Sequence, residues 1–107
     1  MKSSTFSAAY HALPDSIKSL VQRMIHDFNP DEIILFGSRA RGNHRVNSDF
    51  DIAVKAASIQ PSVWARLQID LQEEPITLYQ VDLVDLGQMN DDYKNRISVE
   101  GKVLYVR

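Results

Sequence analysis

Residues 32–51, EIILFGSRARGNHRVNSDFD, decide the fold. Residues 32–36 are short, apolar and followed directly by Gly37, which is typical of a buried strand that ends at a tight turn. Residues 38–42 can form one helical turn, and residues 43–47 are polar and indicate a loop. The next strand is expected over residues 48–55. The segment therefore predicts two strands joined by a short connection.

Helices and further strands are expected on both sides of this segment. Pro14 suits the first position of a helix, and apolar residues then recur as one buried helical stripe until Asn29-Pro30 ends it. The other expected elements are a helix that begins at Pro61 and ends before Pro75, a strand over residues 78–86, a helix between Asn90 and Gly101, and a strand over residues 103–106.

Strands that alternate with helices in this order predict an α/β or α+β fold, a mixed sheet of about four strands with helices mainly on one face. Because the first two strands lack a full crossover helix between them, at least one neighbouring pair is expected to be antiparallel. A length of 107 residues predicts one domain, residues 1–107, in which residues 1–12 form a loosely held arm.

The composition excludes several classes of function. Apolar residues make up 44% and charged residues 24%, as in folded globular proteins, and the net charge of -2 argues against stable binding to a nucleic-acid backbone. The absence of cysteine excludes disulfides, zinc knuckles and thiol nucleophiles. No apolar run approaches the roughly 18 residues of a membrane span. We therefore expect a cytoplasmic protein without a membrane partner.

The turn after the first strand resembles an anion site. Gly37 permits a tight turn, and a helix that opens at Ser38 offers backbone N–H groups and a hydroxyl to phosphate oxygens. Arg39, Arg41 and Arg45 place three basic residues within seven positions of an acidic protein. The alternative is an ordinary strand-to-helix turn with solvated arginines.

Asp49 and Asp51 form the second part of the candidate site. On an extended strand their Cα atoms lie about 6.6 Å apart on one face, so the carboxylates can converge on ions separated by about 3.5–4 Å. Hard oxygen ligands without His or Cys favour Mg²⁺ or Mn²⁺. The alternative is a solvent-facing edge strand whose charges discourage pairing with other strands.

A third carboxylate is expected from residues 80–86, QVDLVDL. Asp82 lies inside an apolar run, where an unpaired carboxylate is costly, whereas Asp85 stands near Gly87, where an acidic turn residue is ordinary. We choose Asp82 and keep Asp85 as the alternative. If Asp82 reaches the metal pair, it can bind one ion and accept the proton of an attacking hydroxyl.

Together these residues resemble a known signature. Gly37-Ser38, ten residues, Asp49-x-Asp51 and a later carboxylate in VDLVDL resemble the nucleotidyltransferases related to DNA polymerase β. The resemblance runs from the first helix to the closing EGKVLYV, and the chain resembles in particular the minimal nucleotidyltransferases, the MNT half of HEPN/MNT toxin-antitoxin pairs.

The resemblance implies a role for each position. It implies that Ser38 holds the triphosphate of ATP, that Asp49 and Asp51 bind two Mg²⁺ ions, with Mn²⁺ as an alternative, and that Asp82 binds one metal and assists deprotonation. Arg39 and Arg41 match the GSxARG run of the family, and whether they contact nucleotide or brace the turn stays open.

The resemblance also implies a function, a type VII-like antitoxin. Such a protein adenylyltransferase transfers AMP from ATP to a tyrosine of a cognate HEPN ribonuclease toxin and so neutralises it. About 100 residues leave no room for an acceptor-recognition domain, so another molecule must bring the hydroxyl. Two alternatives stay open. One is an antitoxin that acts by binding alone, and the other is an enzyme that modifies a small molecule such as an aminoglycoside.

Overall fold

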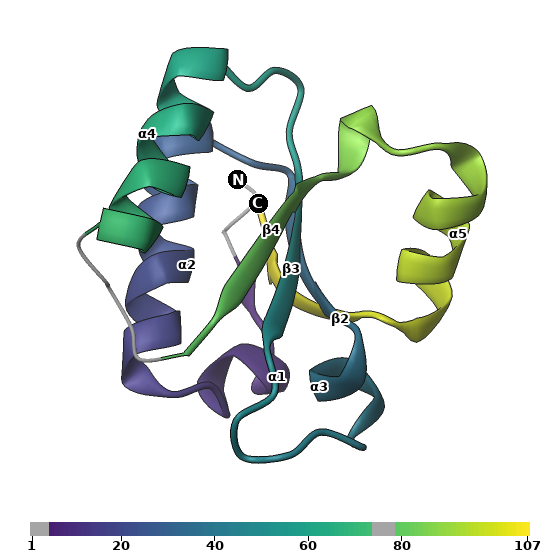
Figure 1. Cartoon of the computed structure of the whole chain (residues 1–107). Coiled ribbons are helices and arrows are strands. Elements are labelled where there is room, and N and C mark those ends of the chain that lie inside the picture. The colour runs from purple at the N-terminus through teal and green to yellow at the C-terminus, as the bar shows by residue number, and fades with distance from the viewer. Residues whose placement is uncertain (1–4, 74–78) are drawn as a thin grey trace.

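The computed structural model describes residues 5–73 and 79–107, which contain a five-stranded sheet in the order β1-β5-β2-β3-β4 (Figure 1). The β3–β4 pair is parallel and the other three pairs are antiparallel. The predicted mixed α/β fold and the predicted antiparallel neighbours, β2 and β3, are confirmed. The strands are β1 (Thr5–Phe6), β2 (Glu32–Phe36), β3 (Phe50–Lys55), β4 (Val81–Asp85) and β5 (Lys102–Val106).

Helices cover both faces of the sheet unequally. The longer helices α2 (Asp15–Phe28) and α4 (Pro61–Glu73) lie on one side, and α5 (Asp91–Glu100) lies on the other (Figure 1). The predicted apolar stripe of α2 packs into the core: five of its residues are buried and Ile25 is partly buried. The shorter helical segments are α1 (Ala8–His11), α3 (Ser38–Arg41) and the 3₁₀ turn η1 (Leu86–Gln88).

Apolar clusters on both faces of the sheet explain why the sequences of the central strands are continuous apolar runs. Ile33 and Ile52 belong to the cluster that includes the buried residues of α2, whereas Ile34 and Ala53 pack with Ile97 of α5. Since strand residues alternate between faces, both faces of the central strands need apolar side chains. The same alternation places Asp51 on the α5 face, between Phe50 and Ile52 on the α2 face.

Several predicted boundaries shift by one or two residues. β3 begins at Phe50 rather than at residue 48, because Ser48 closes a turn in which its Oγ accepts from the Arg45 backbone N–H at 2.8 Å. Pro14 is the N-cap of α2, one position before the predicted one. β4 ends at Asp85, and the first residue of its predicted range, 78, lies outside the described residues, as does Pro75.

The predicted loosely held arm is wrong for residues 5–12. β1 pairs with the carboxyl-terminal strand β5, with Thr5 opposite Val106, and the ring of Phe6 lies 5.1 Å from that of Tyr105. Tyr10 of α1 is buried, and its hydroxyl accepts a hydrogen bond from Gln22. Aromatic burial offsets the entropy cost of ordering this segment. The segment therefore supplies β1, the outermost strand at the edge of the sheet opposite β4.

None of the helices in the two described ranges combines the length and the apolar content that crossing a bilayer would require.

Candidate active site

The register of β3 and β4 brings two of the predicted carboxylates together. Asp51 is the Cα partner of Asp82, and neighbouring strands lie about 4.8 Å apart, so the two side chains leave the same face next to one another. Asp49 stands one residue before β3 and is exposed, as is Asp82, whereas Asp51 is half-buried. The three carboxylates therefore gather at the amino-terminal ends of β3 and β4.

The electrostatics of Asp51 reflect this gathering. Burial raises the pKa of the Asp51 carboxyl, the negative charges of Asp82 and then Asp49 raise it further, and the positive charge of Arg41 opposes them. A carboxylate that is held beside two others favours a proton or another cation as a counter-charge. The position of Asp51 thus suits a cation-binding role.

Gly37 lies directly against this carboxylate, and Ser38 is the next residue. Gly37 has φ = +72°, a conformation that glycine adopts easily, and a Cβ atom at this position would collide with the Asp51 carboxylate oxygen Oδ2. The Gly37 carbonyl accepts hydrogen bonds from the amides of Ala40 and Arg41, each at 3.1 Å, which closes the turn. Only glycine allows the turn to approach Asp51 this closely, and Ser38 follows it.

The three arginines have different surroundings. Arg39 donates to the backbone carbonyls of Val46 and Ser48 at 3.0–3.2 Å, and its guanidinium lies 4.1 Å from the centre of the Phe50 ring. Arg41 forms an ion pair with Glu100 of α5 at 3.4 Å, and its positive charge partly opposes the rise in the pKa of Asp51. Arg45 is exposed. The structure therefore places Arg41 beside the carboxylates and Arg39 against aromatic rings.

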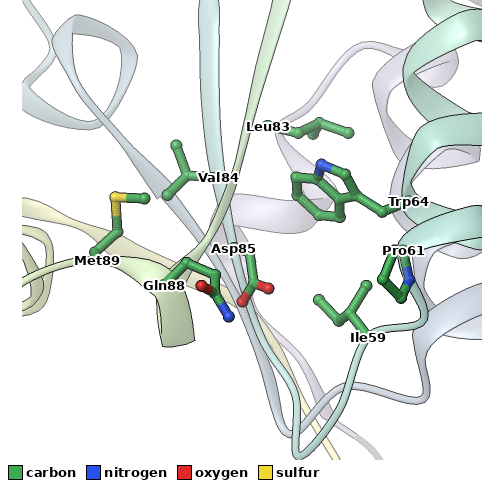
Figure 2. A pocket seen from close by; sticks show the side chains of 8 residues that line it. All are labelled: Ile59, Pro61, Trp64, Leu83, Val84, Asp85, Gln88 and Met89. Atoms are coloured by element: carbon green, nitrogen blue, oxygen red, sulfur yellow. The ribbon is translucent and has the colours of Figure 1, made fainter.

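Asp85 lies apart from the three gathered carboxylates. Its register partner is Val54, three residues or about 10 Å further along the strands, and it points to the opposite face of β4. It lines a cavity of about 520 Å³ together with Ile59, Trp64 and Leu83 (Figure 2). Its Oδ1 accepts from the Gly87 backbone N–H at 3.1 Å, which caps η1. Asp85 thus has a local structural role.

Of the two candidate third carboxylates, Asp82, the predicted one, is the one that lies beside Asp51. The predicted reason, that Asp82 is enclosed in an apolar run, is wrong. Asp82 is exposed at the edge of the sheet rather than enclosed in an apolar run, because β4 is the outermost strand. Its proximity to Asp51 comes from the parallel register, which sequence alternation alone does not contain. Sequence reasoning also missed Glu100, whose contact with Arg41 spans 59 positions and has no local signal.

The carboxylates fit a metal that is shared with a ligand. Within residues 5–73 and 79–107, no three His, Cys, Asp or Glu side chains are arranged to hold an ion by themselves. Mg²⁺ is usually bound by one or two carboxylates together with substrate phosphates rather than by a complete protein cage. The all-oxygen donors of Asp49, Asp51 and Asp82 beside a turn suited to phosphate match that mode of binding.

Comparison with known proteins places the chain in a family. Residues 17–107 match the family described as Polymerase beta, Nucleotidyltransferase, so the chain belongs to this family of nucleotidyltransferases. No curated protein sequence matches the chain.

Solved structures add a more specific similarity. One is a toxin-antitoxin with AMP-PNP, with a TM-score of 0.67 and 26% identity over 88% of this chain and 75% of that chain. A mutant of the toxin-antitoxin MntA-HpeT gives a TM-score of 0.65, also with 26% identity over 88% and 75% of the two chains. A structure of a minimal nucleotidyltransferase, at 23% identity, shares the fold with a TM-score of 0.63 over 79% and 85% of the chains.

Proposed function

We propose that this chain is the antitoxin of a toxin-antitoxin pair and a metal-dependent enzyme that transfers AMP from ATP to a tyrosine of a cognate HEPN ribonuclease. The observation that carries the proposal is the pairing of Asp51 with Asp82 beside the Gly37 turn. Membership of the nucleotidyltransferase family supports the reaction type. The similar structures, described as a toxin-antitoxin with AMP-PNP and as MntA-HpeT, support the nucleotide and the partner.

The chain's residues divide the chemistry between them. Asp49, Asp51 and Asp82 would hold Mg²⁺ or Mn²⁺, which when bound lowers the pKa of the acceptor hydroxyl and neutralises phosphate charge. Ser38 would donate a hydrogen bond to the triphosphate, and Asp82 would accept the proton of the tyrosine hydroxyl. The tyrosine oxygen forms a bond to the α-phosphorus, the bond from that phosphorus to the bridging oxygen breaks, and pyrophosphate leaves.

The exposure of the carboxylates suits an acceptor on another protein. Asp49 and Asp82 are both exposed, so a tyrosine that projects from a partner surface can reach them without any opening of the fold. Arg41 is also exposed and is held by Glu100, which places a positive charge next to the same face. A protein substrate can therefore approach the β3–β4 end directly.

The test is transfer of label from α-labelled ATP to the partner in the presence of Mg²⁺. Wild-type chain should label the HEPN protein, and Asp49→Asn should abolish labelling because a neutral amide is a poor Mg²⁺ ligand. Asp31→Asn is the matched control, since Asp31 pairs with Arg107 away from the site. Circular dichroism should show that both variants are folded. Labelling that persists in the folded Asp49→Asn protein would refute the metal assignment.

Two other outcomes identify the alternatives. If Asp49→Asn protects cells from the toxin as well as wild type does at equal abundance, neutralisation occurs by binding alone. If pyrophosphate is released with an aminoglycoside and no protein partner, the acceptor is a small molecule.

A further inference from the structure

We propose that Arg39 is a positioning residue that holds together the three segments on which the candidate catalytic groups stand. Arg39 belongs to α3, directly after Ser38. Its guanidinium contacts the segment that contains Asp49 and a ring that lies three residues before Asp82. The AMP-transfer readout of this inference rests on the proposed function. The contacts of Arg39 and the Mn²⁺-binding readout do not depend on AMP transfer.

The first contact ties α3 to the start of β3. Arg39 donates from Nε to the Ser48 carbonyl at 3.2 Å and from one terminal nitrogen to the carbonyls of Ser48 at 3.0 Å and Val46 at 3.1 Å. Ser48 immediately precedes Asp49. The direction of the Asp49 backbone is therefore fixed relative to the Gly37–Ser38 turn by the two bonds to its neighbour.

The second contact reaches the start of β4. The Arg39 guanidinium carbon lies 4.1 Å from the centre of the Phe50 ring and 5.3 Å from that of Tyr79, and the two rings meet edge to face at 5.1 Å. The Phe50 backbone N–H also donates to the Gln80 carbonyl at 2.9 Å, beside the first ladder pair of β3 and β4. The stacked groups therefore lie where the register that pairs Asp51 with Asp82 begins.

The location of the guanidinium argues against direct contact with phosphate. Phe50 is 2% exposed and packs on the α2 face of the sheet, whereas Asp51, the next residue, faces α5. Because the guanidinium lies over the Phe50 ring, it is on the face that Asp51 does not use. Arg39 thus acts through the backbone of residues 46–50 and through Tyr79, and Arg41 is the arginine next to the carboxylates.

Arginine suits this position better than lysine. A planar guanidinium can stack on rings while its edge donates two or more hydrogen bonds in one plane, whereas an ammonium is a compact point charge. A lysine would keep the positive charge but lose the shared contact with Ser48 and Phe50. The substitution Arg39→Lys therefore separates a geometric role from a role as a charge that attracts phosphate.

The experiment compares Arg39→Lys and Arg39→Met with wild type, with Arg66→Met on α4 as the matched control. Mn²⁺ affinity is measured by the loss of the free-ion electron paramagnetic resonance signal, without nucleotide or partner. AMP transfer to the HEPN protein is measured under saturating partner, well below each protein's Tm. We expect both Arg39 variants to bind Mn²⁺ about tenfold more weakly, because groups that orient metal ligands typically contribute that much to metal affinity. We expect kcat to fall roughly 10–100-fold, because displacement of reacting groups by about 1 Å can cost that much. KM for ATP should stay within about threefold of wild type.

The outcomes distinguish this inference from the proposed function. Wild-type kcat and Mn²⁺ affinity in Arg39→Lys, or a rise confined to KM for ATP in Arg39→Met, would overturn the positioning role and indicate a phosphate contact. If Arg39→Met does not fold, Arg39→Lys decides. If the wild-type chain transfers no AMP, the proposed function fails, and the Mn²⁺ affinities of wild type, Arg39→Lys and Arg66→Met alone decide the role of Arg39.

Discussion

The two aspartates of β4 have the same chemistry and lie three residues apart, yet their surroundings differ completely. Asp82 is exposed beside Asp51 at the end of the sheet that carries the Gly37 turn. Asp85 faces the other side, caps η1 and lines an apolar cavity with Trp64 (Figure 2). The difference shows that the partner strand and the face, rather than residue type, decide which of the two carboxylates lies beside Asp51.

The largest expected effect separates these two aspartates. Asp82→Asn should lower the rate of AMP transfer by roughly 10²–10⁴-fold, because a group that accepts a proton in the transition state is lost. Asp85→Asn should leave the rate close to that of wild type, since this side chain is on the opposite face. Single-turnover labelling of the partner measures both rates. An equal loss of AMP-transfer rate in Asp82→Asn and Asp85→Asn would contradict a catalytic difference between the two positions.

A second comparison uses two glycines of the same turn. Gly37 and Gly42 both have positive φ, at 72° and 82°, but a Cβ at Gly37 collides with Asp51 whereas a Cβ at Gly42 meets nothing within 4 Å. Gly42→Ala should lose about 1–2 kcal/mol because Gly42 has an αL backbone. Gly37→Ala should lose at least as much for its backbone, because φ = 72° with ψ = -157° is a region that is essentially confined to glycine. Gly37→Ala should also displace Asp51, so its free energy of unfolding should fall further and its activity should disappear.

Thermal unfolding and labelling check this pair. Each kcal/mol corresponds to about 4–8 °C in Tm for a domain of this size. An active Gly37→Ala protein, or a Tm equal to that of Gly42→Ala, would contradict the close approach of the turn to the carboxylate.

The smallest expected effect concerns the pH dependence of stability. Because the folded state raises the pKa of Asp51, it holds the Asp51 proton more tightly than the unfolded chain does. Stability is therefore lost as pH rises from below the ordinary aspartate pKa through the raised pKa of Asp51. Asp51→Asn does not titrate, so without metal it should have a higher Tm than wild type at pH 7 and an equal one in acid.

Asp85→Asn is the control for this pH series, and its Tm at pH 7 should not exceed that of wild type. Added Mg²⁺ should narrow the difference between wild type and Asp51→Asn, because only the carboxylate binds the ion well. A constant Tm difference from acid to neutral pH would contradict the electrostatic coupling of Asp51 to its neighbours.

Local features of the site could be predicted from the sequence, and long-range ones could not. The placement of Asp49 and Asp51 follows from alternation along one strand, and the Gly37 turn follows from a glycine after an apolar run. The neighbour of Asp51 across β4 depends on which strands pair and in what register, and the contacts of Arg39 with Tyr79 join positions 40 residues apart. Residues 5–12 are held in place by aromatic contacts with the carboxyl-terminal strand, such as that of Phe6 with Tyr105. The hydrophobic periodicity of the sequence carries no information about such long-range contacts.

The parallel pairing of β3 and β4 separates the geometry of the carboxylates from the length of chain between them. Asp51 and Asp82 meet through backbone hydrogen bonds between strands, and the connection that includes α4 only has to return the chain to the correct end of the sheet. A crossover of a different length could therefore leave the pairing of Asp51 with Asp82 unchanged. The crossover is where the fold can acquire new surfaces without disturbing its chemistry.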